Sequence, residues 1–286
     1  MKNLKYFFQF IIIYIFFLFC KILGYKRSSD FGSFIGKFFG PLFRSKKIIT
    51  KNLKLAYPKI SNNEIDIITN DMWKNYGRIL SDYVFIKDFR KLNLDNYIKL
   101  ENEEIIKKIK SFDKPVVFIS GHFNNFELLA MKIEMLGINL SAIYRPLNNF
   151  FLNKIMMNIR TKYICKSQIP KGLSGLKKSL NFFKNGSSLA LMIDQRVSEG
   201  ESVNFFNHKA LTTTIPAQFV KKFKCLIVPV YIERVDKYYF KLKIDEPLKF
   251  DEKLSVNQIT QELNNWLEKK INHNPSQWIW THNRWK

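Results

Sequence analysis

Short apolar runs alternate with longer helical patterns through the second half of the chain, and this alternation constrains the fold more than any other feature. The apolar runs, each of a length suited to one strand, are 116–120, 141–144, 189–193, 226–231 and 238–244. The segments with helical spacing of apolar residues lie near 125–136, 150–162, 173–184, 214–223 and 256–271. Such alternation is typical of an α/β fold, in which helices cover a sheet. We therefore predict a central mixed sheet flanked by helices, with a hairpin around residues 235–237.

The N-terminal segment 6–23 is almost continuously apolar, interrupted by Gln9 and Lys21. A helix of this length would measure roughly 27 Å at about 1.5 Å per residue, close to the ~30 Å hydrocarbon core of a bilayer. A cleaved signal peptide needs small residues at its exit, and Leu18-Phe19-Cys20 offers none. Basic residues are more numerous after the run than before it, which favours a cytoplasmic location for the rest of the protein. We predict an uncleaved membrane-anchoring helix within residues 1–25.

The region that follows the predicted anchor has helical character. Residues 61–86 carry apolar residues at helical spacing, and Ser61 with Glu64 forms the capping-box pattern that begins a helix. Residues 31–43 are aromatic and basic, which suits either the membrane interface or a core helix. We expect residues 26–110 to form a helical, membrane-proximal region and residues 111–286 to form the α/β core.

The charge balance is strongly basic, with 47 Lys and Arg against 24 Asp and Glu and a formal net charge of +23. Such a field favours an anionic membrane surface, an acidic protein or a nucleic acid as partner. A general bias toward Lys, Asn, Ile and Phe is the alternative source of the charge. The sequence has no helix-turn-helix, zinc-finger or RNA-recognition pattern. A membrane-tethered nucleic-acid-binding protein is therefore the remote alternative, and we expect no nucleic acid partner.

A histidine and a glutamate follow the first predicted strand, in the stretch V-V-F-I-S-G-H-F-N-N-F-E. Gly121 permits a sharp turn, and Asn124 or Asn125 is suited to cap the next helix. Ligands of α/β sheets bind at the carboxyl ends of strands, where His122 would lie. A carboxylate at Glu127 could accept one imidazole N–H and leave the other nitrogen to take a proton from an attacking hydroxyl. A structural histidine beside an incidental glutamate is the alternative.

Other catalytic signatures are missing from the sequence. The chain has no G-x-S-x-G, no P-loop and no G-x-G-x-x-G after a predicted strand. His208, His273 and His282 are isolated from Cys and acidic clusters, so we expect no metal site and no cofactor. The three cysteines are far apart and suggest no disulfide framework, which fits a reducing compartment. With no candidate Ser or Cys nucleophile, direct group transfer in a ternary complex is favoured over a covalent intermediate.

The order of several motifs resembles one enzyme family over essentially the whole chain. The motifs are F-I-S-G-H-F-N-N-F-E, then Y-R-P-L-N-N at 144–149, L-M-I-D-Q at 191–195, F-F-N-H-K-A-L-T-T-T at 205–214 and P-S-Q-W-I-W-T-H-N-R-W-K at 275–286. The first contains H-x-x-x-x-[DE], the motif of the glycerolipid and lysophospholipid acyltransferase superfamily. The ordered set is similar to the late acyltransferases of lipid A biosynthesis, the lauroyl and myristoyl transferase family.

This resemblance implies transfer of a fatty acyl chain from an acyl carrier protein thioester to a hydroxyl of a lipid A precursor, at the cytoplasmic face of the bacterial inner membrane. It makes His122 the general base and Glu127 its orienting partner. Arg160 and Asp194 occupy the places of a family arginine and aspartate, although a surface charge and a turn cap are their ordinary alternatives. Arg160 would bind a phosphate or the donor's phosphopantetheine. Arg145, after another predicted strand, is a further candidate for the same electropositive pocket.

Two departures from the family pattern leave the acceptor open. The family often has Gly and Trp where this chain has Asn124 and Phe126, and relatives in the superfamily acylate other glycolipids or lysophospholipids. Coenzyme A is the alternative donor. A relative that binds lipid without catalysis is a further alternative, and the presence of the four motif residues argues against it. For the Trp-rich C-terminus we expect core packing or interfacial anchoring.

Overall fold

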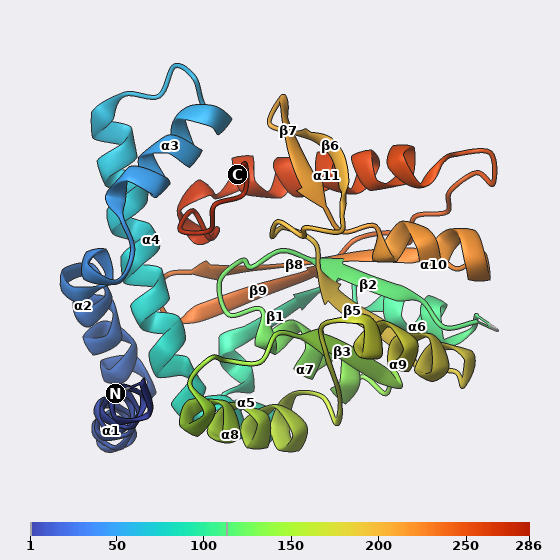
Figure 1. The fold of residues 1–286 in the computed structure, drawn as a ribbon. Coiled ribbons are helices and arrows are strands. Elements are labelled where there is room, and N and C mark those ends of the chain that lie inside the picture. Colours follow the sequence, from blue (N-terminus) through green and yellow to red (C-terminus); the bar gives the residue numbers. More distant parts are fainter. Residues whose placement is uncertain (1, 113) are drawn as a thin grey trace.

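A mixed sheet is the centre of the structure (Figure 1), and the computed structural model describes residues 2–112 and 114–286. Within those residues the sheet has seven strands in the order β1-β9-β8-β2-β5-β3-β4. Their bounds are β1 Ile98–Glu101, β2 Val117–Ser120, β3 Leu140–Tyr144, β4 Ser167–Pro170, β5 Ser188–Met192, β8 Ile227–Val235 and β9 Tyr239–Ile244. β8 and β9 pair antiparallel, whereas the other neighbours pair parallel. The predicted mixed sheet is confirmed, and so is the hairpin.

Helices cover both faces of the sheet, as an α/β fold requires. The helices that follow the N-terminal region are α5 Ile86–Arg90, α6 Glu104–Lys110, α7 Glu127–Met135, α8 Phe150–Ile159, α9 Leu173–Lys184, α10 Ile215–Phe223 and α11 Val256–His273. In Figure 1, α10 and α11 lie above the strands and α7 lies below them. A short π-helix, η3 (Arg160–Ile164), continues directly from α8.

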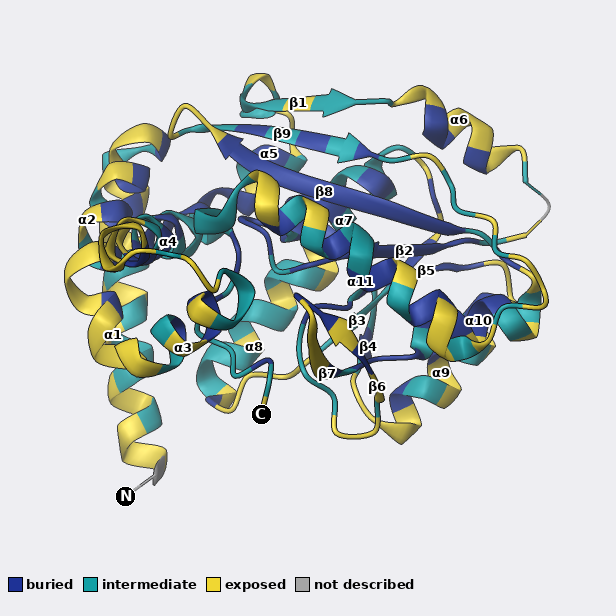
Figure 2. Ribbon diagram, turned by 90° about the horizontal axis from the view of Figure 1, so that it is seen from above, coloured by how far each residue is buried: buried dark blue, intermediate teal, exposed yellow. Residues whose placement is uncertain are grey.

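The central strands are buried along their length, which explains their continuous apolar sequences. All four residues of β2 are buried, and in β8 only Val235 is exposed (Figure 2). The edge strands β1 and β4 are short and partly polar, and the pattern of apolar runs did not predict them. A separate antiparallel hairpin, β6 (Glu201–Phe205) with β7 (His208–Thr212), packs beside α11 and was also not predicted.

The N-terminal region consists of α1 (Lys2–Leu23), α2 (Tyr25–Phe43), α3 (Lys46–Ala56) and α4 (Asn62–Asp82). The predicted capping box of Ser61 and Glu64 is present at the start of α4. The segment Asn3–Leu23 of α1 is long and apolar enough to cross a membrane, with mean hydropathy 2.2 and 6% of its most apolar window buried. Strand β1 lies within the range 26–110 and pairs with β9, so this range contributes to the sheet as well as to the helical layer.

Glycines bring α2 and α4 into close contact. Gly32 and Gly36 of α2 face Gly77 of α4, and a Cβ atom built on Gly77 would lie 1.8 Å from the carbonyl oxygen of Gly32. A Cβ atom on Gly36 would lie 2.2 Å from the carbonyl oxygen of Trp73. Only a residue without a side chain permits this approach. The contact fixes the apolar N-terminal helices to α4, which in turn borders the candidate site described next.

Candidate active site

His122 lies at the carboxyl end of β2, as expected, and a neighbouring strand supplies its partner. The carboxylate of Asp194 accepts from the backbone N–H of His122 at 2.8 Å, and its Oδ1 lies 2.7 Å from His122 Nδ1. The parallel register of β2 and β5 explains this contact. Ser120 is paired with Met192, so His122 and Asp194, each two residues further on, leave the sheet at the same level.

The Asp194 carboxylate is fully buried and has a third donor, the indole N–H of Trp278, at 2.9 Å. Burial raises the pKa of this carboxyl group, but the electrostatic interaction with the His122 imidazole and the hydrogen bonds from His122 and Trp278 outweigh burial, so the pKa lies below its ordinary value. An ionised carboxylate only accepts hydrogen bonds, so the proton of neutral His122 is on Nδ1. The lone pair is then on Nε2.

Glu127 is not the hydrogen-bond partner of His122, which corrects the expectation from the H-x-x-x-x-E spacing. Its Oε1 accepts instead from the Tyr83 hydroxyl at 2.5 Å and from Arg160, whose Nε lies 2.8 Å away and whose Nη2 also donates. Glu127 is the first residue of α7, and both of its partners come from other helical segments, η1 (Tyr83–Phe85) and η3. The H-x-x-x-x-E spacing pointed to Glu127, the carboxylate near His122 in sequence. The register of the sheet instead brings Asp194, which is distant in sequence, to the histidine.

The Glu127–Arg160 ion pair is almost fully withdrawn from solvent, with side-chain exposures of 7% and 12%. Burial lowers the pKa of Arg160, but the Glu127 carboxylate and the Tyr83 hydroxyl more than offset it, so the guanidinium pKa lies above its ordinary value. Burial, together with the negative charge of Glu127, raises the pKa of Tyr83 well above its usual range. Arg160 therefore stays charged and Tyr83 stays protonated at neutral pH.

The loop that carries His122 is held by a buried polar network. Asn124 has a φ of 42°, in the left-handed region, and its amide donates to Asn75 and to Gln277, each at 2.8 Å. The amide of Asn125 donates to Asp82 at 3.2 Å. Neither side chain caps α7, so that expectation is wrong; both amides point into the protein interior instead. A third element reaches the same network, because Arg234 of β8 donates to Asp82 at 2.5 Å.

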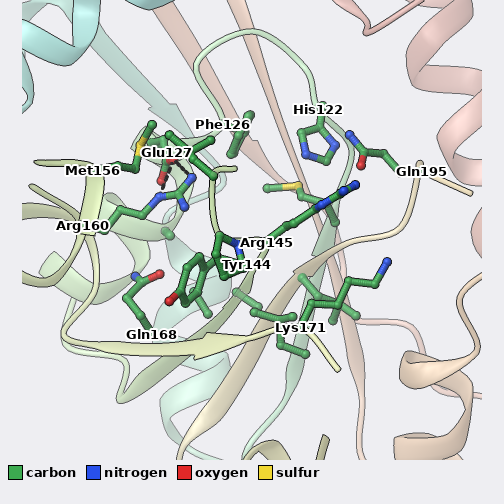
Figure 3. Close-up of a pocket in the computed structure, with 18 of the residues that line it drawn as sticks. His122, Phe126, Glu127, Tyr144, Arg145, Met156, Arg160, Gln168, Lys171 and Gln195 are labelled. Carbon is green, nitrogen blue, oxygen red and sulfur yellow. Dashed lines mark hydrogen bonds and ion pairs between the residues drawn. The ribbon is translucent and has the colours of Figure 1, made fainter. Parts of the chain in front are cut away.

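A cavity of about 520 Å³ opens beside His122 (Figure 3). Figure 3 shows His122 and Gln195 on one side of the cavity and Glu127 with Arg160 on the other. The apolar part of its wall includes Ala130, Ala142, Ile143, Met156, Ile164, Ala190 and Leu191. Arg44, Arg145 and Lys171 add basic side chains. Four of the five predicted site residues, His122, Glu127, Arg145 and Arg160, therefore line one cavity, and the fifth, Asp194, holds His122 from behind.

Several residues that sequence reasoning did not assign to the site belong to it. Trp278 contacts Asp194, Tyr83 contacts Glu127, and His282, Gln195 and Lys171 line the cavity. The Trp-rich C-terminal motif was the available signal for Trp278 and His282. His282 Nε2 accepts from the backbone N–H of Arg196 at 3.0 Å, and burial lowers its pKa to about 4. Among the described residues, no three His, Cys, Asp or Glu side chains gather as a metal-binding cluster.

The phenylalanine that departs from the family pattern shapes this cavity. Phe126 lines it, and the Phe126 ring packs edge-to-face against the His122 imidazole with centroids 4.9 Å apart. Asn124, by contrast, is buried in the network behind the loop. The two departures therefore act in different places: one contributes to the wall that a substrate would touch, and the other to the support of the histidine loop.

Comparison with known sequences gives a family match along the whole chain. A family model described as bacterial lipid A biosynthesis acyltransferase matches residues 1–286. The lipid A biosynthesis palmitoleoyltransferase of Escherichia coli K12 is 22% identical over 269 residues, covering 92% of this chain and 86% of that protein. Lipid A biosynthesis acyltransferase 2 of Shigella flexneri is 22% identical over 256 residues, covering 86% and 79%.

Among solved structures, the 1-acyl-sn-glycerophosphate acyltransferase of Thermotoga maritima is similar, with 11% identity, a TM-score of 0.42 and coverage of 96% of this chain and 99% of that one. The α/β fold and the cavity beside a histidine, taken with the family match, define the chain as an acyltransferase. More specifically, it belongs to the bacterial lipid A biosynthesis acyltransferase family, and its acceptor is accordingly a glycolipid.

Proposed function

We propose that this acyltransferase moves a fatty acyl chain from an acyl carrier protein thioester to a hydroxyl of a lipid A precursor, with His122 as general base. The observation that carries the proposal is the His122–Asp194 pair at the mouth of the cavity, with Nδ1 bonded to a buried carboxylate at 2.7 Å. Such a partner fixes the imidazole orientation and leaves Nε2 free to accept a proton.

The chemical step follows from that geometry. The acceptor hydroxyl gives its proton to His122 Nε2 as its oxygen attacks the thioester carbonyl carbon. The new C–O bond forms, the C–S bond breaks when the tetrahedral intermediate collapses, and His122 returns the proton to the leaving sulfur. Asp194 stabilises the imidazolium that forms between the two proton transfers. Positioning both substrates beside one base supplies much of the rate enhancement in a reaction of this kind.

Arg160, Arg145 and Glu127 have supporting parts in this proposal. Glu127 holds the Arg160 guanidinium at the cavity wall through the buried ion pair. Arg160 then presents a fixed positive charge to a phosphate of either substrate, and Arg145, which is exposed at the mouth, adds a second cation. The apolar wall formed by residues such as Ala142, Ala190 and Ile164 suits the acyl chain.

The proposal places the enzyme at the cytoplasmic face of the bacterial inner membrane. The exposed apolar surface of α1 supports anchoring there. Exposed phenylalanines of α2, Phe34, Phe38, Phe39 and Phe43, support additional contact with the membrane interface. The net charge of +23 suits an anionic bilayer, a phosphorylated acceptor and an acidic donor protein. In this view α1 is the anchor, residues 26–110 border the membrane, and residues 111–286 carry the chemistry.

The test is acyl transfer by the purified, detergent-solubilised protein. The donors are a mixture of acyl carrier protein thioesters, and in a parallel reaction the matching coenzyme A thioesters. The acceptor is a tetra-acylated lipid A precursor, and mass spectrometry reads the lipid. We expect one additional acyl mass, formed faster from the carrier protein. Absence of product from folded enzyme would overturn the lipid A assignment, and other glycolipids and lysophospholipids would then be the acceptors to test.

A further inference from the structure

One continuous segment beside the cavity is free of acidic residues. Between Glu134 and Asp194 the sequence contains no Asp or Glu, although it contains several Lys and Arg. The segment supplies β3, α8, β4, α9 and β5. In the described part of the chain, Arg160 is the only basic side chain of this segment that forms an ion pair. The remaining basic side chains therefore present positive charge that the protein itself does not neutralise.

This charge is located at the mouth of the cavity and continues along α9. Arg145 and Lys171, from the ends of β3 and β4, line the cavity and are exposed. Lys171 stands two residues before α9, so the helix starts at the mouth. One side of α9 packs on the sheet through Gly175, Ser179 and Phe183, which are buried. The opposite side exposes Leu173 (85% accessible), Lys177, Lys178 and Lys184.

The composition of this surface favours a soluble partner over a bilayer. Residues 31–63 are equally free of Asp and Glu, but there the helix α2 exposes a cluster of phenylalanines beside α1, which suits lipid. The exposed side of α9 combines lysines with a single apolar side chain, Leu173. In Figures 1 and 2, α9 also lies on the opposite side of the molecule from α1 and α2. Lipid and a protein partner would thus approach from different sides.

We propose that the exposed side of α9, together with Lys171 and Arg145, is the docking surface for an acidic carrier protein that delivers the acyl thioester. The inference rests on the proposed function, in which such a protein is the donor. Lys177 and Lys184, which are about two helical turns apart, can pair with carboxylates on a partner helix, and Leu173 gives that helix an apolar contact. Because the surface adjoins the cavity, a docked carrier directs its phosphate-bearing arm past Arg145 and Lys171 toward His122. Complementary charge of this kind accelerates association and sets orientation.

The test compares two double charge reversals in full-length enzyme in detergent. Lys177→Glu with Lys178→Glu alters the docking surface. Lys107→Glu with Lys110→Glu makes the same change in charge on exposed positions of α6, on the other side of the sheet in Figure 2. Initial rates are measured with an acyl carrier protein thioester and with the acyl-pantetheine thioester, which lacks the protein. Binding of each variant to anionic phospholipid vesicles is measured in parallel.

We expect the α9 variant to raise the KM for the carrier protein thioester by about tenfold, with kcat within about twofold, and the effect to diminish as salt is raised. The acyl-pantetheine rate and vesicle binding should match those of the α6 variant. Equal KM values for the two variants would overturn the inference, and so would a loss of vesicle binding confined to the α9 variant. If the unaltered enzyme uses acyl-pantetheine but not the carrier protein thioester, the proposed donor itself is wrong.

Discussion

At the scale of single residues, the structure divides two carboxylates between two tasks. Asp194 holds His122, and Glu127 holds Arg160. The distinction matters because both carboxylates are adjacent to the same cavity and both belong to motifs of the family. Each assignment has its own kinetic consequence.

Asp194→Asn should lower kcat by about 10²–10⁴-fold with little change in folding, because an amide can donate to Nδ1 and so favour the wrong imidazole tautomer. Steady-state rates of acyl transfer, with circular dichroism as the folding control, measure this. Activity within tenfold of the unaltered enzyme would show that another group orients His122.

Glu127 and Arg160 should behave as one unit. Glu127→Gln leaves a buried guanidinium without its counter-charge, and Arg160→Gln leaves a buried carboxylate, so each single change is costly. A double-mutant cycle on kcat/KM should therefore give a coupling of about tenfold or more. The matched cycle of Asp194→Asn with Arg160→Gln should give a smaller coupling, because these two side chains do not contact each other. Additive effects in the Glu127–Arg160 cycle would show that the two residues act independently.

His282 links the stability of the fold to pH. Burial lowers its pKa to about 4 from an ordinary value of 6.5, so between these values the unfolded chain binds a proton that the folded protein does not. Stability should therefore fall as pH drops from about 6.5 toward 4. Urea unfolding at pH 7 and pH 5 should show a larger loss for the unaltered protein than for His282→Gln, which does not titrate. Equal losses would contradict a buried neutral histidine.

At the scale of elements, the strands that could be predicted from the sequence are the buried ones. The strands with long apolar runs, β2, β5 and β8, were found within four residues of their observed ends because their burial leaves a clear pattern. β4 ends in Pro170 and is short and polar, so it had no such pattern. The strand ends located His122 and Asp194 at one edge of the sheet. The register that pairs them required the structure, since it depends on contacts distant in sequence.

The contact between α2 and α4 was likewise not predicted, because glycine spacing in a helix has several explanations. Gly77→Ala should destabilise the protein by about 1–3 kcal/mol, since the added methyl group meets the backbone of Gly32 and the helices must separate. Thermal unfolding in detergent measures the effect, with Ser174→Ala on the exposed side of α9 as control. If the two substitutions shift the midpoint equally, the helices are not tightly packed there.

At the scale of the whole molecule, α4 links the apolar N-terminal helices to the candidate site. The apolar helices α1 and α2 are fastened to α4, and α4 contributes Asn75 and Asp82 to the network behind the histidine loop. The C-terminal segment closes the other side, where Trp278 reaches Asp194 and the buried Arg284 donates to Leu211 and Thr212. Elements from the N-terminal region and from the C-terminal segment thus support one cavity.

In the proposed mechanism, His122 carries out the proton transfer of acylation in this cavity. The most direct measurement is the initial rate of acyl transfer to a lipid A precursor by the full-length protein and by His122→Ala, each verified as folded. We expect product from the unaltered enzyme and a rate at least about 10²-fold lower from the variant. A His122→Ala enzyme that forms product at a comparable rate would contradict this mechanism.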